Sequence, residues 1–249
     1  MMNISIRFKK LILSACWLLM AVGLHAQHSM GVTGLLNIPT ADMQADGTFM
    51  VGVNYLPEQM LPEHWDYNSG NYFLNMTFLP CLEIGYRCTL LKLKTGKWNQ
   101  DRSVSLRIRP LKEGKYWPSV VVGSNDALTT GQLNTFSEVT GNRYFSSVYG
   151  VATKHFLPGG HDLAFTFGWN IPFRKHAVRD GVFGGMSYSP AFCRPLSLMA
   201  EYDGNVVNMG GSVRLFNHFT VHVFCYDLEA VSCGVRYELV LLGKKGGRP

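Results

Sequence analysis

The sequence predicts an all-β fold, an antiparallel up-and-down transmembrane β-barrel of about 12 strands. Charged residues make up 16% of the chain, against about 25% in soluble globular domains, while hydrophobic residues reach 47%. Apolar and polar side chains alternate along segments that are mostly nine to twelve residues long. The connections between these segments are alternately short and long, except that those near 204–205 and 228–230 are short as well. These observations disfavour a helical bundle or a disordered chain and favour a barrel with an apolar outer face.

Residues 1–26 contain the three parts of a secretory signal peptide. Basic residues lie in Arg7-Phe8-Lys9-Lys10, an apolar stretch covers residues 11–24, and the small residue Ala26 marks the expected cleavage site. We expect cleavage after Ala26. An alternative is lipidation at Cys16, because Leu13-Ser14-Ala15-Cys16 matches the lipobox of bacterial lipoproteins, although only five apolar residues would precede that cut.

Removal of this signal lowers the formal charge of +6 by three, and no run of five basic residues remains. Nucleic acid is therefore not an expected partner. The rest of the chain has no run of eighteen apolar residues, so no transmembrane helix is expected. An exported chain of this kind is either a soluble periplasmic or secreted β-domain or an outer-membrane β-barrel.

The exported chain divides into three parts. We expect residues 27–46 to form an N-terminal periplasmic segment, residues 47–242 to form the barrel and residues 243–249 to form a C-terminal tail. Within the barrel, a period of two places one apolar and one polar face on each strand. The strands are expected near 47–55, 71–79, 82–92, 102–110, 117–125, 144–155, 161–170, 181–189, 196–203, 206–215, 219–227 and 231–242.

The connections support a membrane barrel over a soluble one. Those after the even-numbered strands are short, whereas those near 56–70, 93–101, 126–143 and 171–180 are longer, as the periplasmic turns and outer loops of outer-membrane barrels are. Aromatic residues gather at the short turns and would form one interfacial girdle; in a soluble sandwich or lipocalin-like barrel they would cap the core. These residues are Phe78, Trp117, Phe156, Phe192, Phe216 and Phe219.

Eight charged residues lie on the polar faces of the expected strands. In a membrane barrel they must point into the lumen, because a charge facing lipid at mid-depth costs roughly 2–4 kcal/mol. Two interpretations remain open: they bind an anionic or hydroxyl-rich chain that passes through, or they form a structural network of Arg–carboxylate pairs. The residues are Glu83, Arg87, Arg107, Arg109, Glu201, Arg214, Arg236 and Glu238.

The sequence offers no catalytic, metal or cofactor motif. It has no H-E-x-x-H or G-x-S-x-G, and His155, His161 and His176 lie near turns, where solvation explains them. The cysteines have no C-x-x-C spacing, so neither a metal nor a cofactor is expected. We therefore expect no enzyme, although an outer-membrane lipase or acyltransferase with dispersed catalytic residues stays an alternative.

The final hairpin has a predicted register. If residues 228–230 form its loop, Asp227 faces Val231 and Cys225 faces Cys233. The Cβ atoms of the two cysteines would then lie about 4.5–5.5 Å apart, on the apolar face.

The segment after the signal carries a family resemblance. Residues 31–43 read GVTGLLNIPTADM and are followed by Asp46-Gly47-Thr48; further matching stretches are Leu79 to Arg87, Glu113 to Pro118 and Ala200 to Asp203. The opening motif resembles that of the YjbH-like exopolysaccharide biosynthesis proteins. The resemblance implies a Gram-negative outer-membrane β-barrel associated with secretion of exopolysaccharide or capsule, here in a short, single-barrel version.

The expected function is thus non-enzymatic assistance in export or surface assembly of an exopolysaccharide or capsule, in the outer membrane. The expected partners are outer-membrane lipid, the exopolysaccharide and polysaccharide-export proteins. Three alternatives remain: a small-solute outer-membrane channel, a lipid-modifying outer-membrane enzyme and a soluble periplasmic β-domain.

Overall fold

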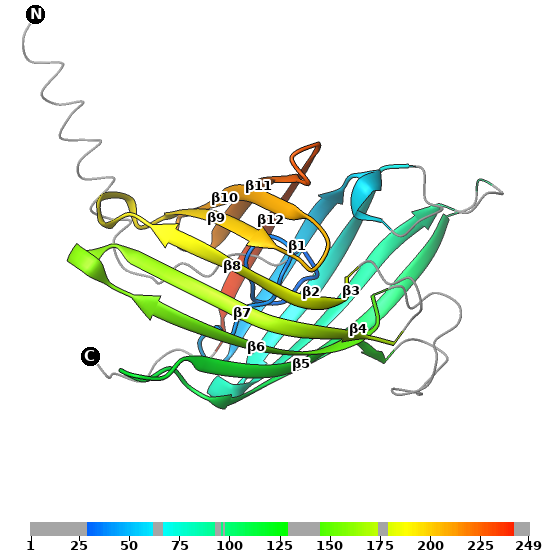
Figure 1. Cartoon of the computed structure of the whole chain (residues 1–249). Coiled ribbons are helices and arrows are strands. Elements are labelled where there is room, and N and C mark those ends of the chain that lie inside the picture. Colours follow the sequence, from blue (N-terminus) through cyan, green and yellow to red (C-terminus); the bar gives the residue numbers. More distant parts are fainter. Residues whose placement is uncertain are drawn as a thin grey trace, which may run out of the picture.

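The computed structural model describes residues 29–61, 67–92, 96, 98–128, 145–173 and 179–241. Within them, twelve antiparallel strands close into one barrel in which each strand pairs with its sequence neighbours and β1 pairs with β12 (Figure 1). The prediction of an up-and-down barrel of about twelve strands is confirmed. The strands are β1 (Thr48–Leu56), β2 (Ser69–Phe78), β3 (Leu82–Lys92), β4 (Trp98–Leu111), β5 (Ser119–Leu128), β6 (Ser147–Phe156), β7 (Asp162–Pro172), β8 (Gly181–Ser189), β9 (Leu196–Tyr202), β10 (Val207–Leu215), β11 (Phe219–Tyr226) and β12 (Ala230–Val240).

The wall of the barrel turns its apolar side chains outward. Along β1, Val51 and Val53 are 38% and 52% exposed, whereas Asn54 is buried. Along β3, Ile84 is exposed and Glu83 is fully buried. This distribution is the reverse of a soluble protein, in which large apolar side chains are buried and charged ones face water.

The two ends of the barrel differ in their connections. The turns after even-numbered strands define what we call the turn end, and three of them contain the short 3-10 helices η2 (Leu79–Cys81), η3 (Pro158–Gly160) and η4 (Ala191–Cys193). The opposite end, called the loop end, holds the longer connections and η1 (Glu58–Met60). The described residues contain no helix that is long and apolar enough to cross a membrane.

The predicted register of the final hairpin is wrong by two residues. Tyr226 pairs with Ala230, so Cys225 faces Val231, and the two cysteines are not directly opposite. The turn begins one residue earlier than expected. Asp227 and Leu228 both have positive φ, and the Glu229 N–H donates to the Tyr226 carbonyl oxygen at 3.0 Å. An aspartate tolerates the left-handed conformation well, which explains why the turn starts at this position. Cys233 and Cys225 still lie on the exposed face, as predicted.

The N-terminal segment lies inside the barrel. Residues 29–44, called the inner segment, are all buried except Asp42, which is half-buried. Its middle forms a tight hairpin, in which Gly34 bridges to Pro39 and the Leu35 N–H donates to the Ile38 carbonyl oxygen at 2.9 Å. Of the segment 27–46 that was expected in the periplasm, the structure places residues 29–44 inside the barrel and leaves Ala45 and Asp46 exposed. The expected signal peptide and the C-terminal tail at 243–249 lie outside the described residues.

Inward aromatic residues fill the space around the inner segment, and four of them lie against a glycine of the adjacent strand. A Cβ atom added at Gly168, for example, would lie 2.3 Å from Cζ of Phe183. A glycine is therefore required where the ring crosses the neighbouring strand. The four directly paired residues of this kind are Gly52 with Phe73, Gly123 with Tyr149, Gly168 with Phe183, and Gly210 with Phe224.

Candidate functional site

The candidate site is the contact between the inner segment and the barrel wall. Leu36, Ile38 and Ala41 supply its apolar part and pack in one buried cluster with rings from the wall, including Tyr149 and Phe183. The backbone of a segment without regular structure also needs hydrogen-bond partners once it is buried. Inward polar side chains of several strands supply them.

Glu83 of β3 and Arg107 of β4 form the first contact with the inner segment. The two side chains are fully buried and their charged groups lie 3.0 Å apart. Glu83 accepts a hydrogen bond from the Thr33 N–H at 2.9 Å, and Arg107 donates to the Thr33 carbonyl oxygen at 2.8 Å and to that of Thr40. The ion pair thus binds both polar groups of one backbone residue, which fixes the first arm of the hairpin against the wall.

Glu201 of β9 holds the tip of the hairpin. Its carboxylate accepts the backbone N–H groups of Leu36, Asn37 and Ile38 at 3.0, 2.7 and 3.4 Å. The Asn208 side chain donates to the same carboxylate at 3.1 Å. Three successive N–H groups pointing at one carboxylate form an anion-binding turn, here filled by a side chain of the wall.

Asn37 connects this tip to two further charged residues. Its amide donates to Asp203 at 2.6 Å, while Arg179 donates to its carbonyl oxygen at 2.8 Å and to its side-chain oxygen. Neither Asp203 nor Arg179 was among the residues predicted from the polar faces. Arg179 lies in the connection between β7 and β8, where no alternation indicates its direction, whereas Asp203 directly follows β9 and has the parity of Glu201, so the strand pattern could have found it.

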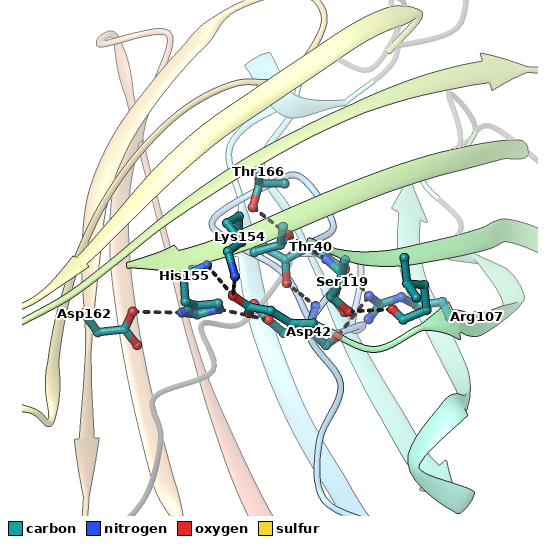
Figure 2. A network of polar contacts seen from close by, with 12 residues as sticks. Thr40, Asp42, Arg107, Ser119, Lys154, His155, Asp162 and Thr166 are labelled. Carbon is teal, nitrogen blue, oxygen red and sulfur yellow. Dashed lines mark hydrogen bonds and ion pairs between the residues drawn. The ribbon is translucent and has the colours of Figure 1, made fainter. Parts of the chain in front are cut away.

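The second arm of the hairpin is held by hydroxyl groups. The Ala41 N–H donates to Thr153 at 2.8 Å, the Ala41 carbonyl oxygen accepts from Ser119 at 2.9 Å, and the Thr153 hydroxyl lies 2.9 Å from that of Thr166. Figure 2 shows Ser119, Thr40 and Thr166 within one group of polar contacts.

Asp42 closes the site at the turn end. His155 lies between two carboxylates, with Nε2 3.1 Å from Asp42 and Nδ1 2.8 Å from Asp162 (Figure 2). The preceding residue, Lys154, contacts Glu113 at 2.8 Å. His155 was expected to be solvated near a turn. The structure shows it half-buried and paired instead, because the inner segment brings Asp42 from 113 positions away.

The remaining predicted residues lie in the wall, away from the hairpin tip. Arg214 contacts Glu238, and Arg236 lies 2.7 Å from the same carboxylate, so these three form a separate buried ion-pair group. Arg87 is buried, and its guanidinium group donates to the sulfur atom of Met30 in the inner segment. Arg109 is only half-buried and donates to the Pro80 carbonyl oxygen at the turn end.

The structure thus brings Glu83, Arg107 and Glu201 together on the inner segment, with Arg87 beside them, and leaves the other four elsewhere. Sequence reasoning missed the inner segment as their partner, although the motif at residues 31–43 indicated its importance. Among the described residues, no group of three or more His, Cys, Asp and Glu side chains is arranged to hold a metal ion.

Comparison with known proteins matches the chain to a family model. The family model described as YjbH, exopolysaccharide biosynthesis protein YbjH, matches residues 26–172, which include the inner segment and strands β1 to β7. No curated protein shows a significant match to the chain. The matched region contains Glu83, Arg107 and the hairpin that they bind. The chain belongs to the YjbH family of exopolysaccharide biosynthesis proteins.

Proposed function

We propose that this protein is a β-barrel of the Gram-negative outer membrane that assists export or surface assembly of an exopolysaccharide or capsule without catalysing a reaction. The observation that carries the proposal is a closed barrel with apolar side chains outside and a buried polar interior. Membership of an exopolysaccharide biosynthesis family supports the polysaccharide as the partner.

The aromatic residues support insertion in a membrane. Those expected to form a girdle all face outward at or near the turn end and are between 43% and 78% exposed. Aromatic side chains favour the boundary between hydrocarbon and headgroups, because their rings are apolar and their edges tolerate water. A belt of exposed aromatic side chains therefore raises the free energy of a protein in water but stabilises it at a bilayer interface. The residues are Phe78, Trp117, Phe156, Phe192, Phe216 and Phe219.

The filled interior argues against the alternative of an open small-solute channel. Residues 29–44 occupy the barrel and are bound by the wall at both arms and at the tip. A barrel of twelve strands is also well below the 16–18 strands of porins with aqueous channels. We therefore propose that the protein acts on the polysaccharide at the membrane surface, together with polysaccharide-export proteins, rather than as a free pore.

The experiment deletes the gene in the source cells and restores it on a plasmid. We expect deletion to lower surface polysaccharide and the restored protein to be recovered with outer membranes after density-gradient separation. Recovery in the soluble periplasmic fraction, or unchanged surface polysaccharide in the deletion strain, would contradict the proposal. Turnover of lipid by the purified protein would point instead to the enzyme alternative.

A planar-bilayer measurement tests the channel alternative. The intact protein should show no stable conductance, whereas a variant lacking residues 29–44 should conduct ions, provided that its heat-modifiable gel mobility shows a folded barrel. Stable conductance by the intact protein would favour the small-solute channel.

A further inference from the structure

A pocket opens at the loop end of the barrel, between the inner segment and the wall. It is partly open to solvent at this end of the barrel. Asn37 and Ile38 of the hairpin form one side, while Asn125 of β5, Ser147 of β6 and Asn170 of β7 belong to the other. It lies at the opposite end of the barrel from His155.

The pocket contains an unsatisfied polar atom. Asn125 is 6% exposed, and its amide donates to the Ser147 hydroxyl at 3.3 Å. Its side-chain oxygen has no hydrogen-bond partner among the described residues. Because buried polar atoms are nearly always hydrogen-bonded, an acceptor left open in a pocket wall indicates a ligand or water that donates to it.

The charged groups of the pocket are already bound within the protein. Arg179 donates to both oxygens of Asn37, and Asp203 accepts from Asn37 and from the backbone of Asn205 and Val206. Arg179 and Asp203 together carry no net charge, so they give no preference for an anion or a cation, and the buried Nε of Arg179, which has no partner among the described residues, is one further donor. The ligand that fits this wall is therefore uncharged.

Apolar rings complete the pocket. Phe145 lies beneath Arg87, whose guanidinium carbon is 4.6 Å from the ring centre, and Phe183 is fixed edge-on against Tyr149. Amide and hydroxyl groups next to such rings suit a sugar, because sugar hydroxyls both donate and accept hydrogen bonds while the C–H face of the ring is apolar.

We infer that this pocket binds an uncharged sugar unit of the polysaccharide, and this inference rests on the proposed function. The sugar hydroxyls hydrogen-bond to Asn125 and Asn170, and the apolar face of the sugar packs against Phe145. The hairpin tip forms part of the pocket, so Glu201 acts as a positioning residue: it holds the turn that carries Asn37.

The test measures binding by calorimetry to the purified, detergent-folded protein. The probe is a set of neutral oligosaccharides released by partial hydrolysis from the surface polysaccharide of the source cells, and oligogalacturonate serves as the anionic comparison. The variants are Asn125→Leu and Asn170→Leu, which remove an amide with little change in volume. Asn205→Leu is the matched control, because this asparagine is exposed at the same end and does not line the pocket.

We expect the neutral oligosaccharides to bind and each pocket variant to weaken binding about tenfold, since a sugar hydroxyl would lose its partner. Asn205→Leu should bind as the unaltered protein does. Heat-modifiable gel mobility confirms that each variant is folded. No binding by the folded protein, stronger binding of oligogalacturonate, or equal binding by all variants would overturn the inference.

The two proposals fail in different ways. If deletion of the gene lowers surface polysaccharide but the folded protein binds no neutral oligosaccharide, the pocket inference fails and the proposed function stands. If deletion leaves surface polysaccharide unchanged, the proposed function fails. The assignment of this polysaccharide as the source of the bound sugar then fails as well.

Discussion

At the scale of single residues, the interior depends on a few buried acceptors that each hold several donors. Glu201 accepts three backbone N–H groups of the hairpin tip and the Asn208 amide. A carboxylate in this position compensates the cost of burying a charge by making several charge-assisted hydrogen bonds. Replacing it by a neutral group should therefore weaken the attachment of the whole hairpin to the wall.

Glu201→Gln should loosen the inner segment. Glutamine keeps one acceptor oxygen but turns an NH₂ group toward backbone donors, and hydrogen bonds to a charged group are worth about 1.5–3 kcal/mol. We expect the free energy of unfolding to fall by about 2 kcal/mol, measured by urea titration in micelles with tryptophan fluorescence. Glu229→Gln is the control, because this glutamate is exposed in the β11–β12 turn. Equal stability of the two variants would show that the three N–H contacts carry no net energy.

The paired glycines make a second prediction at this scale. In Gly168→Ala the new Cβ would lie 2.3 Å from Cζ of Phe183, so the ring or the strand must move. Overpacking of this kind costs about 1–3 kcal/mol. Gly150→Ala is matched, because this glycine is also in a central strand but has nothing within 4 Å of the added atom. We expect a lower urea midpoint for the first variant alone; an equal shift for both would mean that the ring is not fixed over the glycine.

At the scale of elements, the strands were predictable and the register of the last hairpin was not. Apolar and polar residues alternate along each strand, so the ends of β3 and β7 were predicted to within one or two residues. Register depends on which residues form the turn, and moving a three-residue loop by one position shifts every pair by two. Such a shift leaves the apolar face unchanged, so the period-two pattern cannot detect it. Only the positive φ at Asp227 and Leu228 decides between the two.

Cross-linking tests this register. In the observed pairing, Cys233 faces Val223, so the double variant Val223→Cys, Cys225→Ser places two thiols directly opposite each other. Directly opposite Cβ atoms lie about 4.5–5.5 Å apart, against about 7–8 Å for diagonal neighbours. Mild oxidation should therefore form a disulfide faster in the variant than between Cys225 and Cys233 of the unaltered protein, as measured by mass spectrometry. Faster disulfide formation in the unaltered protein than in the variant would instead support the register in which Cys225 and Cys233 face each other.

At the scale of the whole molecule, the sequence predicted the strands of the barrel wall but not the segment that lies inside the barrel. Inward placement of Glu83 and Arg107 followed from parity, but their partner is a segment more than forty positions away in sequence. No local pattern indicates that residues 29–44 lie inside, because they have no period and the wall binds much of their backbone, which carries no information about sequence. The pocket was likewise hidden, since it combines the hairpin with the ends of β5, β6 and β7.

The filled interior changes what charge substitutions should do. Phe165 is 47% exposed and Thr166 is 5% exposed, so they point to opposite faces of β7. In the proposed membrane barrel, Phe165→Arg places a cation against lipid, at a cost of about 2–4 kcal/mol at mid-depth, and should lower recovery in outer membranes. An interior charge would be tolerated in an open lumen, but Thr166 touches Thr153, which binds Ala41.

We therefore expect Thr166→Arg to reach the outer membrane in larger amount than Phe165→Arg and to release the inner segment, which limited proteolysis of intact cells and of purified protein reveals. Thr166→Ser, which keeps the hydroxyl, should behave as the unaltered protein does. Equal loss of both arginine variants from the outer membrane would contradict the assignment of the two faces.

The contacts of Glu83 and Glu201 also bear on the order of folding. The first reaches across 50 residues and the second across 165, to the same short hairpin. Pairing of β1 with β12 is the most distant strand contact in the chain and therefore the slowest to find by chance. The hairpin directly before β1 binds β3 and β4 of the N-terminal half of the barrel and β9 of the C-terminal half. It therefore brings the two halves together before β1 pairs with β12. The inner segment is thus placed to act as a template on which the barrel closes.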